Sequence, residues 1–173
     1  MIRLFLFNSM TFALILTSQL SFGQPPLNFS GVWVLNSIKS GSQFSLMSSS
    51  VIITQDLKAN TINLDITSSS PEKELTKKTE RYILDGKTSV VVGSKEGYTY
   101  KSAVWSSNKK EFTVTELKRI VENGTTKESK RTSVYSLDNE GKTMIITIED
   151  TLPEGSKTSE DGNKIIMIFN KAS

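Results

Sequence analysis

The sequence predicts an all-β protein, a single antiparallel up-and-down meander that closes into a barrel of about 8–10 strands. Apolar and polar side chains alternate over 61–66 and again over 143–148, which is the period of a strand with one buried face. After residue 23 only three alanines remain, whereas serine and threonine number 38 of 150 residues. This composition disfavours helices and suits strands and turns. A long meander protects its edge strands by closing into a barrel.

Turn signals such as Asp85-Gly86, Asn123-Gly124 and Asp161-Gly162 separate ten short runs. The prolines at 25, 26, 71 and 153 all lie outside these runs, as strands with a complete hydrogen-bond ladder require. The connections 37–50, 67–76 and 151–162 are rich in Ser, Lys and Glu, and we expect at most one short helix, within 37–50. The strands that we predict are 31–36, 50–56, 60–67, 77–84, 88–92, 98–106, 110–122, 125–137, 142–150 and 163–170.

Residues 1–23 have the pattern of a signal peptide. A start containing Arg3 precedes an apolar run to Leu16, broken by Asn8 and Ser9, and small residues occupy 21 and 23. The unbroken run is shorter than the ~20 residues that a membrane-spanning helix needs. We expect cleavage after Gly23, leaving 24–173 as one barrel domain that is secreted or periplasmic and has no integral membrane segment.

The chain contains no cysteine and no histidine. This excludes disulfides, thiol nucleophiles, catalytic histidines and the usual Cys/His zinc sites. We expect a non-catalytic monomer without cofactor or metal. The basic runs near 118–119 and 127–131 are interleaved with glutamates, which indicates a solvated hairpin face and no nucleic-acid partner.

Turn lengths predict which side chains share the barrel interior. A two-residue turn at Asn123-Gly124 places Phe112 opposite Tyr135, Val114 opposite Ser133, and Glu116 opposite Arg131. A four-residue turn at 138–141 then places Tyr135 opposite Met144, Ser133 opposite Ile146, and Arg131 opposite Ile148. A three-residue turn at 107–109 brings Tyr100 opposite Glu116 but leaves Lys101 and Trp105 outside. A bulge could return Trp105 to the interior, and the sequence leaves both registers open.

This interior face carries the candidate binding site. A ligand with an anionic or hydrogen-bonding head would contact Arg131. Glu116 lies opposite Arg131 and makes its inward position tolerable, because a buried charge requires pairing. The alternative is that this pair is structural or lies at the barrel rim. The other proposed ligand contacts are Tyr100 and Tyr135 beside the head, and Phe112, Met144, Ile146 and Ile148 along the apolar tail.

The start of the domain, Asn28-Phe29-Ser30-Gly31-Val32-Trp33-Val34-Leu35-Asn36, resembles the Gly-x-Trp segment of lipocalins and fatty-acid-binding proteins. It is most similar to exported bacterial lipocalin-like proteins. Further similarities are Tyr82-x-Leu84-Asp85-Gly86-Lys87, Trp105 and Leu137-x-x-x-Gly141-Lys142-Thr143. The resemblance implies a calycin barrel with a central cavity, in which Trp33 plugs one end.

Two departures limit what the resemblance implies. The 37–50 segment is too short for the two-helix lid of fatty-acid-binding proteins, and 165–170 lacks their Arg-x-Tyr carboxylate clamp. The haem-binding relatives use a histidine, which this chain lacks. We therefore predict a barrel that binds a small hydrophobic or amphipathic molecule without transforming it. The alternative is an envelope or secreted interaction module with a filled barrel, acting through loops 37–50 and 151–162.

Overall fold

The structure is a computed structural model that describes residues 25–71, 73–94, 97–122, 124–138, 140–151 and 164–172. Its ten strands form one antiparallel sheet in the order β4-β3-β2-β1-β10-β9-β8-β7-β6-β5, so the predicted all-β meander is confirmed. The strands are β1 Gly31–Leu35, β2 Ser48–Asp56, β3 Thr61–Ser70, β4 Lys73–Ile83, β5 Ser89–Ser94, β6 Gly97–Trp105, β7 Glu111–Glu122, β8 Thr125–Leu137, β9 Thr143–Thr151 and β10 Lys164–Lys171.

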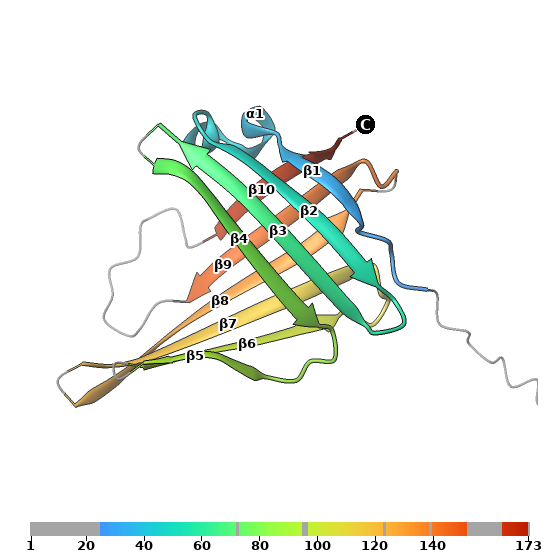
Figure 1. Ribbon diagram of the computed structural model, residues 1–173. Coiled ribbons are helices and arrows are strands. Elements are labelled where there is room, and N and C mark those ends of the chain that lie inside the picture. Colours follow the sequence, from blue (N-terminus) through green and yellow to red (C-terminus); the bar gives the residue numbers. More distant parts are fainter. Residues whose placement is uncertain are drawn as a thin grey trace, which may run out of the picture.

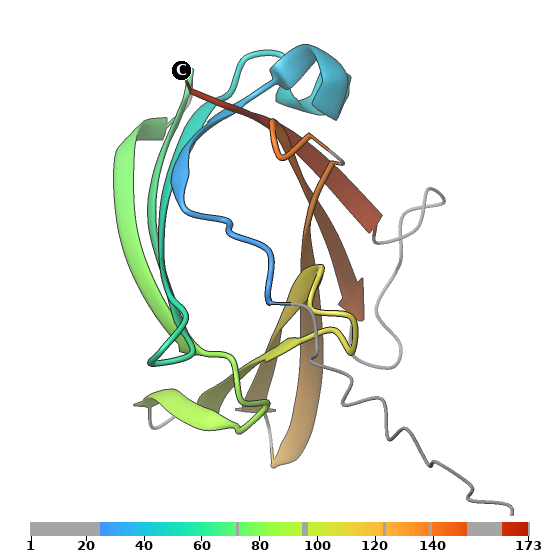
Figure 2. The same ribbon diagram turned by 90° about the vertical axis from the view of Figure 1, so that its right-hand side faces the viewer.

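The sheet curls until its two edges approach each other. Strand β1 pairs with both β2 and β10, and the wall formed by β1–β4 crosses the wall formed by β6–β10 (Figure 1). Viewed after a quarter turn, the two walls enclose a common interior (Figure 2). The edges β4 and β5 do not pair, but an isolated bridge joins Asp85 to Val104 and β4 contacts β6. The result is a nearly closed barrel.

A layer of aromatic side chains closes one end of the barrel. Trp33 is fully buried, and its indole N–H donates to the carbonyl of Phe29 at 2.9 Å. The Phe29 ring meets Phe112 edge-on at 4.9 Å, and Phe112 stacks on Tyr135 at 4.3 Å. Trp33 therefore packs in the core, as a plug should. Among the residues whose burial the structure describes, the buried apolar ones are Phe29, Trp33, Leu35, Phe44, Val51, Ile53, Ile62, Leu64, Tyr82, Leu84, Ala103, Phe112, Val114, Tyr135, Met144, Ile146 and Phe169.

Two short helices, α1 Ser37–Ser40 and the 3-10 helix η1 Ser42–Phe44, join β1 to β2. The Asn36 side chain caps α1 by accepting from the Lys39 amide at 3.0 Å, which satisfies one of the free N–H groups of the first turn. Phe44 from η1 packs into the core. The one short helix expected within 37–50 is present as α1, and the 3-10 helix η1 follows it as a second helical turn. In the described part of the chain, neither helix has the length or hydrophobicity to cross a membrane.

The segment 67–76 is a hairpin end and not the irregular connection that its composition predicts. Strands β3 and β4 pair as far as Ser70 and Lys73, with a register shift between Ser68 and Ser70. Hydroxyl side chains are compatible with the ladder: the Ser68 and Thr76 hydroxyls lie 2.9 Å apart across the hairpin. The predicted leader, 1–23, and most of the 151–162 connection lie outside the described residues.

The register of β6 corrects the sequence prediction. The amide of Ser106 donates to the Glu111 carbonyl at 2.9 Å, so the connection is the four-residue loop 107–110, with Lys109 at φ +55°. The loop is one residue longer than predicted, and this difference moves every β6 side chain to the opposite face of the sheet. Lys101 lies opposite Glu116 and Trp105 opposite Phe112. The predicted inward position of Tyr100 is wrong, because Tyr100 lies opposite Leu117 on the outer face.

The β7–β8 register is as predicted, with Phe112 opposite Tyr135 and Glu116 opposite Arg131, although Asn123 lies outside the described residues. The β8–β9 register differs by two residues. The Asp138 amide donates to the Thr143 carbonyl at 2.9 Å, so the turn occupies 139–142 and not 138–141. Tyr135 consequently pairs with Ile146 and Arg131 with Asp150. An even shift keeps the same side chains inside but changes their partners.

Candidate functional site

The half of the barrel opposite the aromatic plug has an apolar inner wall that is not fully covered. Ile148 and Ile165 are register partners, as are Met167 and the buried Ile146. On the other wall Ile66 is the register partner of the buried Val51. These four side chains, Ile66, Ile148, Ile165 and Met167, are only partly buried against the core. We call them the open apolar wall.

A charged group, the Lys101 triad, faces the interior from β4, β6 and β7. The Lys101 ammonium lies 2.7 Å from Glu80 Oε1 and 3.0 Å from Glu116 Oε2. The side chains of Lys101 and Glu80 are only 12% and 13% exposed, whereas that of Glu116 is 37% exposed. The Tyr82 hydroxyl donates to Glu80 Oε2 at 2.6 Å. Water thus reaches the triad mainly at Glu116.

The position of the triad explains why buried charges are retained there. Strands β4 and β6 carry no continuous ladder between them, so Glu80 and Lys101 connect the two walls through side chains where backbone pairing is absent. The Lys101 ammonium also lies 5.9 Å from the centre of the Tyr82 ring. Partnered charges at a sheet seam can fix its geometry, whereas removal of one partner leaves the other uncompensated.

The pKa shifts follow from these contacts. Burial by itself raises the pKa of Glu80, but hydrogen bonds from Lys101, Lys78 and Tyr82 outweigh it and lower the pKa to about 2. Burial lowers the pKa of Lys101, yet its bonds to Glu80 and Glu116 raise it overall. Burial and the bond to Glu80 raise the pKa of the Tyr82 phenol. At neutral pH Glu80 and Lys101 are therefore both charged and the Tyr82 phenol is protonated.

Arg131 lies at the rim of the open half. Its Nε and Nη2 donate to the two carboxylate oxygens of Asp150 at 2.7 and 2.8 Å. This bond raises the pKa of Arg131 and lowers that of Asp150. The Arg131 side chain is 56% exposed. A cavity of about 210 Å³ beside the pair is lined by Glu116, Lys118, Ser129, Lys130, Arg131, Asp150 and Thr151.

The structure brings together only part of the predicted site. Glu116 and Arg131 line the same cavity, and Ile148 belongs to the open apolar wall. The predicted ion pair between Glu116 and Arg131 is replaced by Glu116–Lys101 and Arg131–Asp150. The remaining predicted contacts do not line the open half: Phe112, Met144, Ile146 and Tyr135 are buried in the core, and Tyr100 is on the outer face.

Sequence reasoning missed Glu80, Tyr82, Lys101 and Asp150. Trp105 could have identified Lys101 as an inward residue. The two residues are four apart on one strand and therefore share a face of the sheet, and a tryptophan needs burial. The inward position of Glu80 follows from the register of the β3–β4 hairpin. That register could not be derived while 67–76 was assigned as an irregular connection. Asp150 could be placed opposite Arg131 only once the position of the β8–β9 turn was known.

The charged groups of the triad hold one another in place. Each acidic or basic group in the triad is held by an opposite charge, and Tyr82 donates to Glu80. Among the described residues no three carboxylates gather in a way that could hold a metal ion. Neither a family model, nor a curated protein, nor a solved structure matches this chain.

Proposed function

We propose that the chain is a lipocalin-like carrier that binds a small, partly apolar molecule in the open half of its barrel without transforming it. The observation that supports this is that four partly buried apolar side chains, Ile66, Ile148, Ile165 and Met167, and the fixed charges of the Lys101 triad face the same barrel interior. Ligand sites typically combine an apolar lining with a few placed polar groups.

The ligand in this proposal lies with its apolar part on Ile148, Ile165 and Met167. Its polar part reaches Glu116, the triad member that water also reaches. Arg131 is already bound by Asp150 at both carboxylate oxygens, so it offers less to an anionic head than an unpaired arginine would. A neutral, hydrogen-bonding head fits this balanced set of charges better than an anionic one.

A matched pair of substitutions tests the site. Ile165 is on the inner face and Ile166, its neighbour, is 44% exposed on the outer face. Ile165→Trp fills the open half, and we expect it to weaken binding of the neutral apolar probe N-phenyl-1-naphthylamine about tenfold in a fluorescence titration. Ile166→Trp adds the same side chain outside and should leave the affinity unchanged. Equal effects of the two variants would refute binding in the barrel.

A second candidate function is an interaction module with a filled barrel. The observation that favours it is the dense core, because 17 apolar residues of the described part of the chain are buried in one cluster. Native mass spectrometry of protein purified without refolding distinguishes the two. A carrier should retain or take up one small molecule per chain, whereas a filled barrel should show only the mass of the protein.

We also propose that the protein is exported and acts outside the cytoplasm, because residues 1–23 have the pattern of a cleaved leader. N-terminal sequencing of protein recovered from the periplasm or medium should begin at Gln24. Recovery that begins at Met1, or recovery only in the membrane fraction, would contradict this proposal.

A further inference from the structure

Two adjoining grooves lie on the outside of the barrel, near the start of β5. The first has a volume of about 360 Å³ and lies between the end of β4, where Arg81 lines it, and the middle of β6. The second, of about 270 Å³, lies over β6 and β7 and is lined by Tyr100 and Thr115 among others. Thr88 and Ser102 line both grooves, so the two form one continuous depression. We call it the seam groove.

The connection 84–88 gives the seam groove a fixed edge. The Gly86 amide donates to the Ala103 carbonyl at 2.8 Å, and a bridge joins Asp85 to Val104. The Asp85 carboxylate accepts from the Lys87 amide at 2.9 Å, as in other tight turns that begin with aspartate. Gly86 has φ +74°, which residues with a side chain rarely adopt. The connection is therefore held against β6, and the groove is formed before any ligand arrives.

The groove belongs to the outer face of the sheet and not to the barrel interior. Tyr100 and Ser102 flank the inward Lys101 along β6, and their register partners on β7 are Leu117 and Thr115. The side chains of such partners lie side by side, about 5 Å apart. The sheet thus separates the seam groove from the open apolar wall, so a molecule in the groove leaves the barrel interior free.

Several polar groups of the groove are free to bind a ligand. Within the described part of the chain, four of them take part in no side-chain hydrogen bond or ion pair: the Arg81 guanidinium and the hydroxyls of Thr88, Ser102 and Thr115. A hydroxyl both donates and accepts hydrogen bonds, and a guanidinium presents a planar fork that matches a carboxylate. At the far end, Arg119 is already paired with Glu128. The groove therefore offers three hydroxyls and one free guanidinium beside the Tyr100 ring.

We propose that the seam groove binds a short acidic oligosaccharide, a chain of sugar rings that carry carboxylates. The sugar hydroxyls pair with Thr88, Ser102 and Thr115, because each partner can donate and accept. A sugar carboxylate accepts two parallel hydrogen bonds from Arg81, the strongest arrangement for such a pair. The apolar face of a sugar ring packs against Tyr100, which combines an apolar ring with a polar hydroxyl.

The lining fits other classes of ligand less well. A wholly apolar molecule would cover the free hydroxyls and the guanidinium without pairing them, which costs free energy. Asp85 is the one carboxylate that lines the groove in the described part of the chain, and a single carboxylate is a poor site for a metal ion. A nucleic acid gains its affinity from many cations along the phosphate backbone, whereas the groove adds only Lys87 to Arg81.

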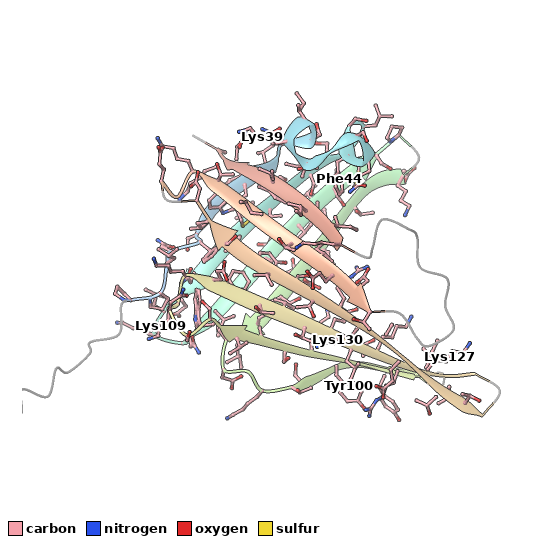
Figure 3. All side chains as sticks on the ribbon, turned by 180° about the vertical axis from the view of Figure 1, so that it is seen from behind. Lys39, Phe44, Tyr100, Lys109, Lys127 and Lys130 are labelled. Atoms are coloured by element: carbon pink, nitrogen blue, oxygen red, sulfur yellow. The ribbon has the colours of Figure 1, made fainter. Side chains whose placement is uncertain are left out.

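Isothermal titration calorimetry of the full chain with trigalacturonate tests the proposal. We expect saturable binding at one site, and the neutral sugar maltotriose should bind at least tenfold more weakly. Arg81→Gln should weaken the binding of trigalacturonate about tenfold or more, since it removes a charge-assisted pair of hydrogen bonds. Lys39→Gln removes the same charge from α1, far from Tyr100 in Figure 3, and should bind normally.

The hydroxyl contribution has its own matched pair of variants. Thr115→Val keeps the shape of the side chain and should weaken binding about fivefold, the effect of one net hydrogen bond. Thr113→Val changes the same strand and face outside the groove and should have no effect. Ile165→Trp fills the barrel interior and should also leave this affinity unchanged, so the result is independent of the ligand proposed for the barrel. The melting temperatures of all groove variants should match the parent within about 3 °C.

Four results would overturn the proposal. The first is that trigalacturonate does not bind, and the second is that Arg81→Gln and Lys39→Gln lose affinity equally. The third is that Thr115→Val binds like the parent. The fourth is that poly-L-glutamate binds as tightly as trigalacturonate, which would mean that the groove recognises carboxylates of an acidic peptide and not a sugar.

Discussion

Replacing Lys101 with methionine tests whether the Lys101 triad joins the two walls of the barrel. Methionine keeps the length and the apolar stem of the side chain but removes the ammonium that lies 2.7 Å from Glu80 and 3.0 Å from Glu116. Loss of one partner of a buried ion pair costs about 3–5 kcal/mol. Glu80 keeps its bonds to Lys78 and Tyr82 and Glu116 reaches water, so the expected loss of unfolding free energy is about 2–3 kcal/mol.

The pH dependence of this loss gives an independent check. The folded pKa of Glu80, about 2, lies below its unfolded value of 4.5. A lowered carboxyl pKa stabilises the fold above the unfolded pKa, and this stabilisation is lost as the pH falls through the folded pKa. The window is therefore about pH 4.5 to 2. Lys101→Met raises the pKa of Glu80, so the difference in stability between variant and parent should be largest at neutral pH and shrink towards pH 2.

The assay is urea unfolding at pH 7 with thermal melts between pH 2 and 7. A loss of 2–3 kcal/mol corresponds to roughly 5–10 °C in Tm for a domain of this size. Adding Glu80→Gln to Lys101→Met should recover part of the loss at pH 7. Lys110→Met, at an exposed turn, should stay within about 0.5 kcal/mol of the parent. If Lys101→Met is as stable as Lys110→Met, or if its loss of unfolding free energy does not change with pH, Lys101 does not join the two walls.

Three further substitutions test the closed end, the β6–β7 contact and the rim. Trp33→Phe removes the indole N–H bond to Phe29 and leaves a cavity at a fully buried site, so urea unfolding should show a loss of about 2–3 kcal/mol; a loss below 1 kcal/mol would contradict the plug. Gly97→Ala would make its Cβ clash with the Arg119 carbonyl oxygen, so the β6–β7 ladder must shift, and amide hydrogen exchange of Tyr98 and Tyr100 should accelerate; an unchanged exchange rate would mean that the strands approach less closely. Arg131→Ala breaks a pair whose arginine is 56% exposed, so its Tm should fall by no more than about 3 °C, and a much larger fall would place Arg131 in the interior.

The strand pattern was predictable from the sequence because period-two alternation and turn residues are local signals. The inner face of β7, β8 and β9 was also predictable, since the β8–β9 error was an even number of residues. The site was less predictable because partners depend on the length of each turn. Lys109 adopts φ +55°, which no local rule requires of a lysine, and the resulting four-residue loop places Lys101 inside and Tyr100 outside.

The contribution of β4 to the Lys101 triad could not be derived from local sequence. Glu80 meets Lys101 across a seam between strands that are not hydrogen-bonded neighbours, so no register arithmetic connects them. Their approach depends on how far the whole sheet curls. Glu116 was identified from the sequence as an inward carboxylate, yet its cation comes from β6 and not from β8.

Methyl NMR during a titration with the neutral probe N-phenyl-1-naphthylamine tests whether a small, partly apolar molecule binds in the open half of the barrel. The account predicts saturable shifts for the methyl groups of Ile66, Ile148, Ile165 and Met167. The buried Met144 and the exposed outer-face Val34 and Ile52 should shift little. Shifts confined to Val34 and Ile52, or no shift in the open apolar wall at saturating probe, would contradict the account.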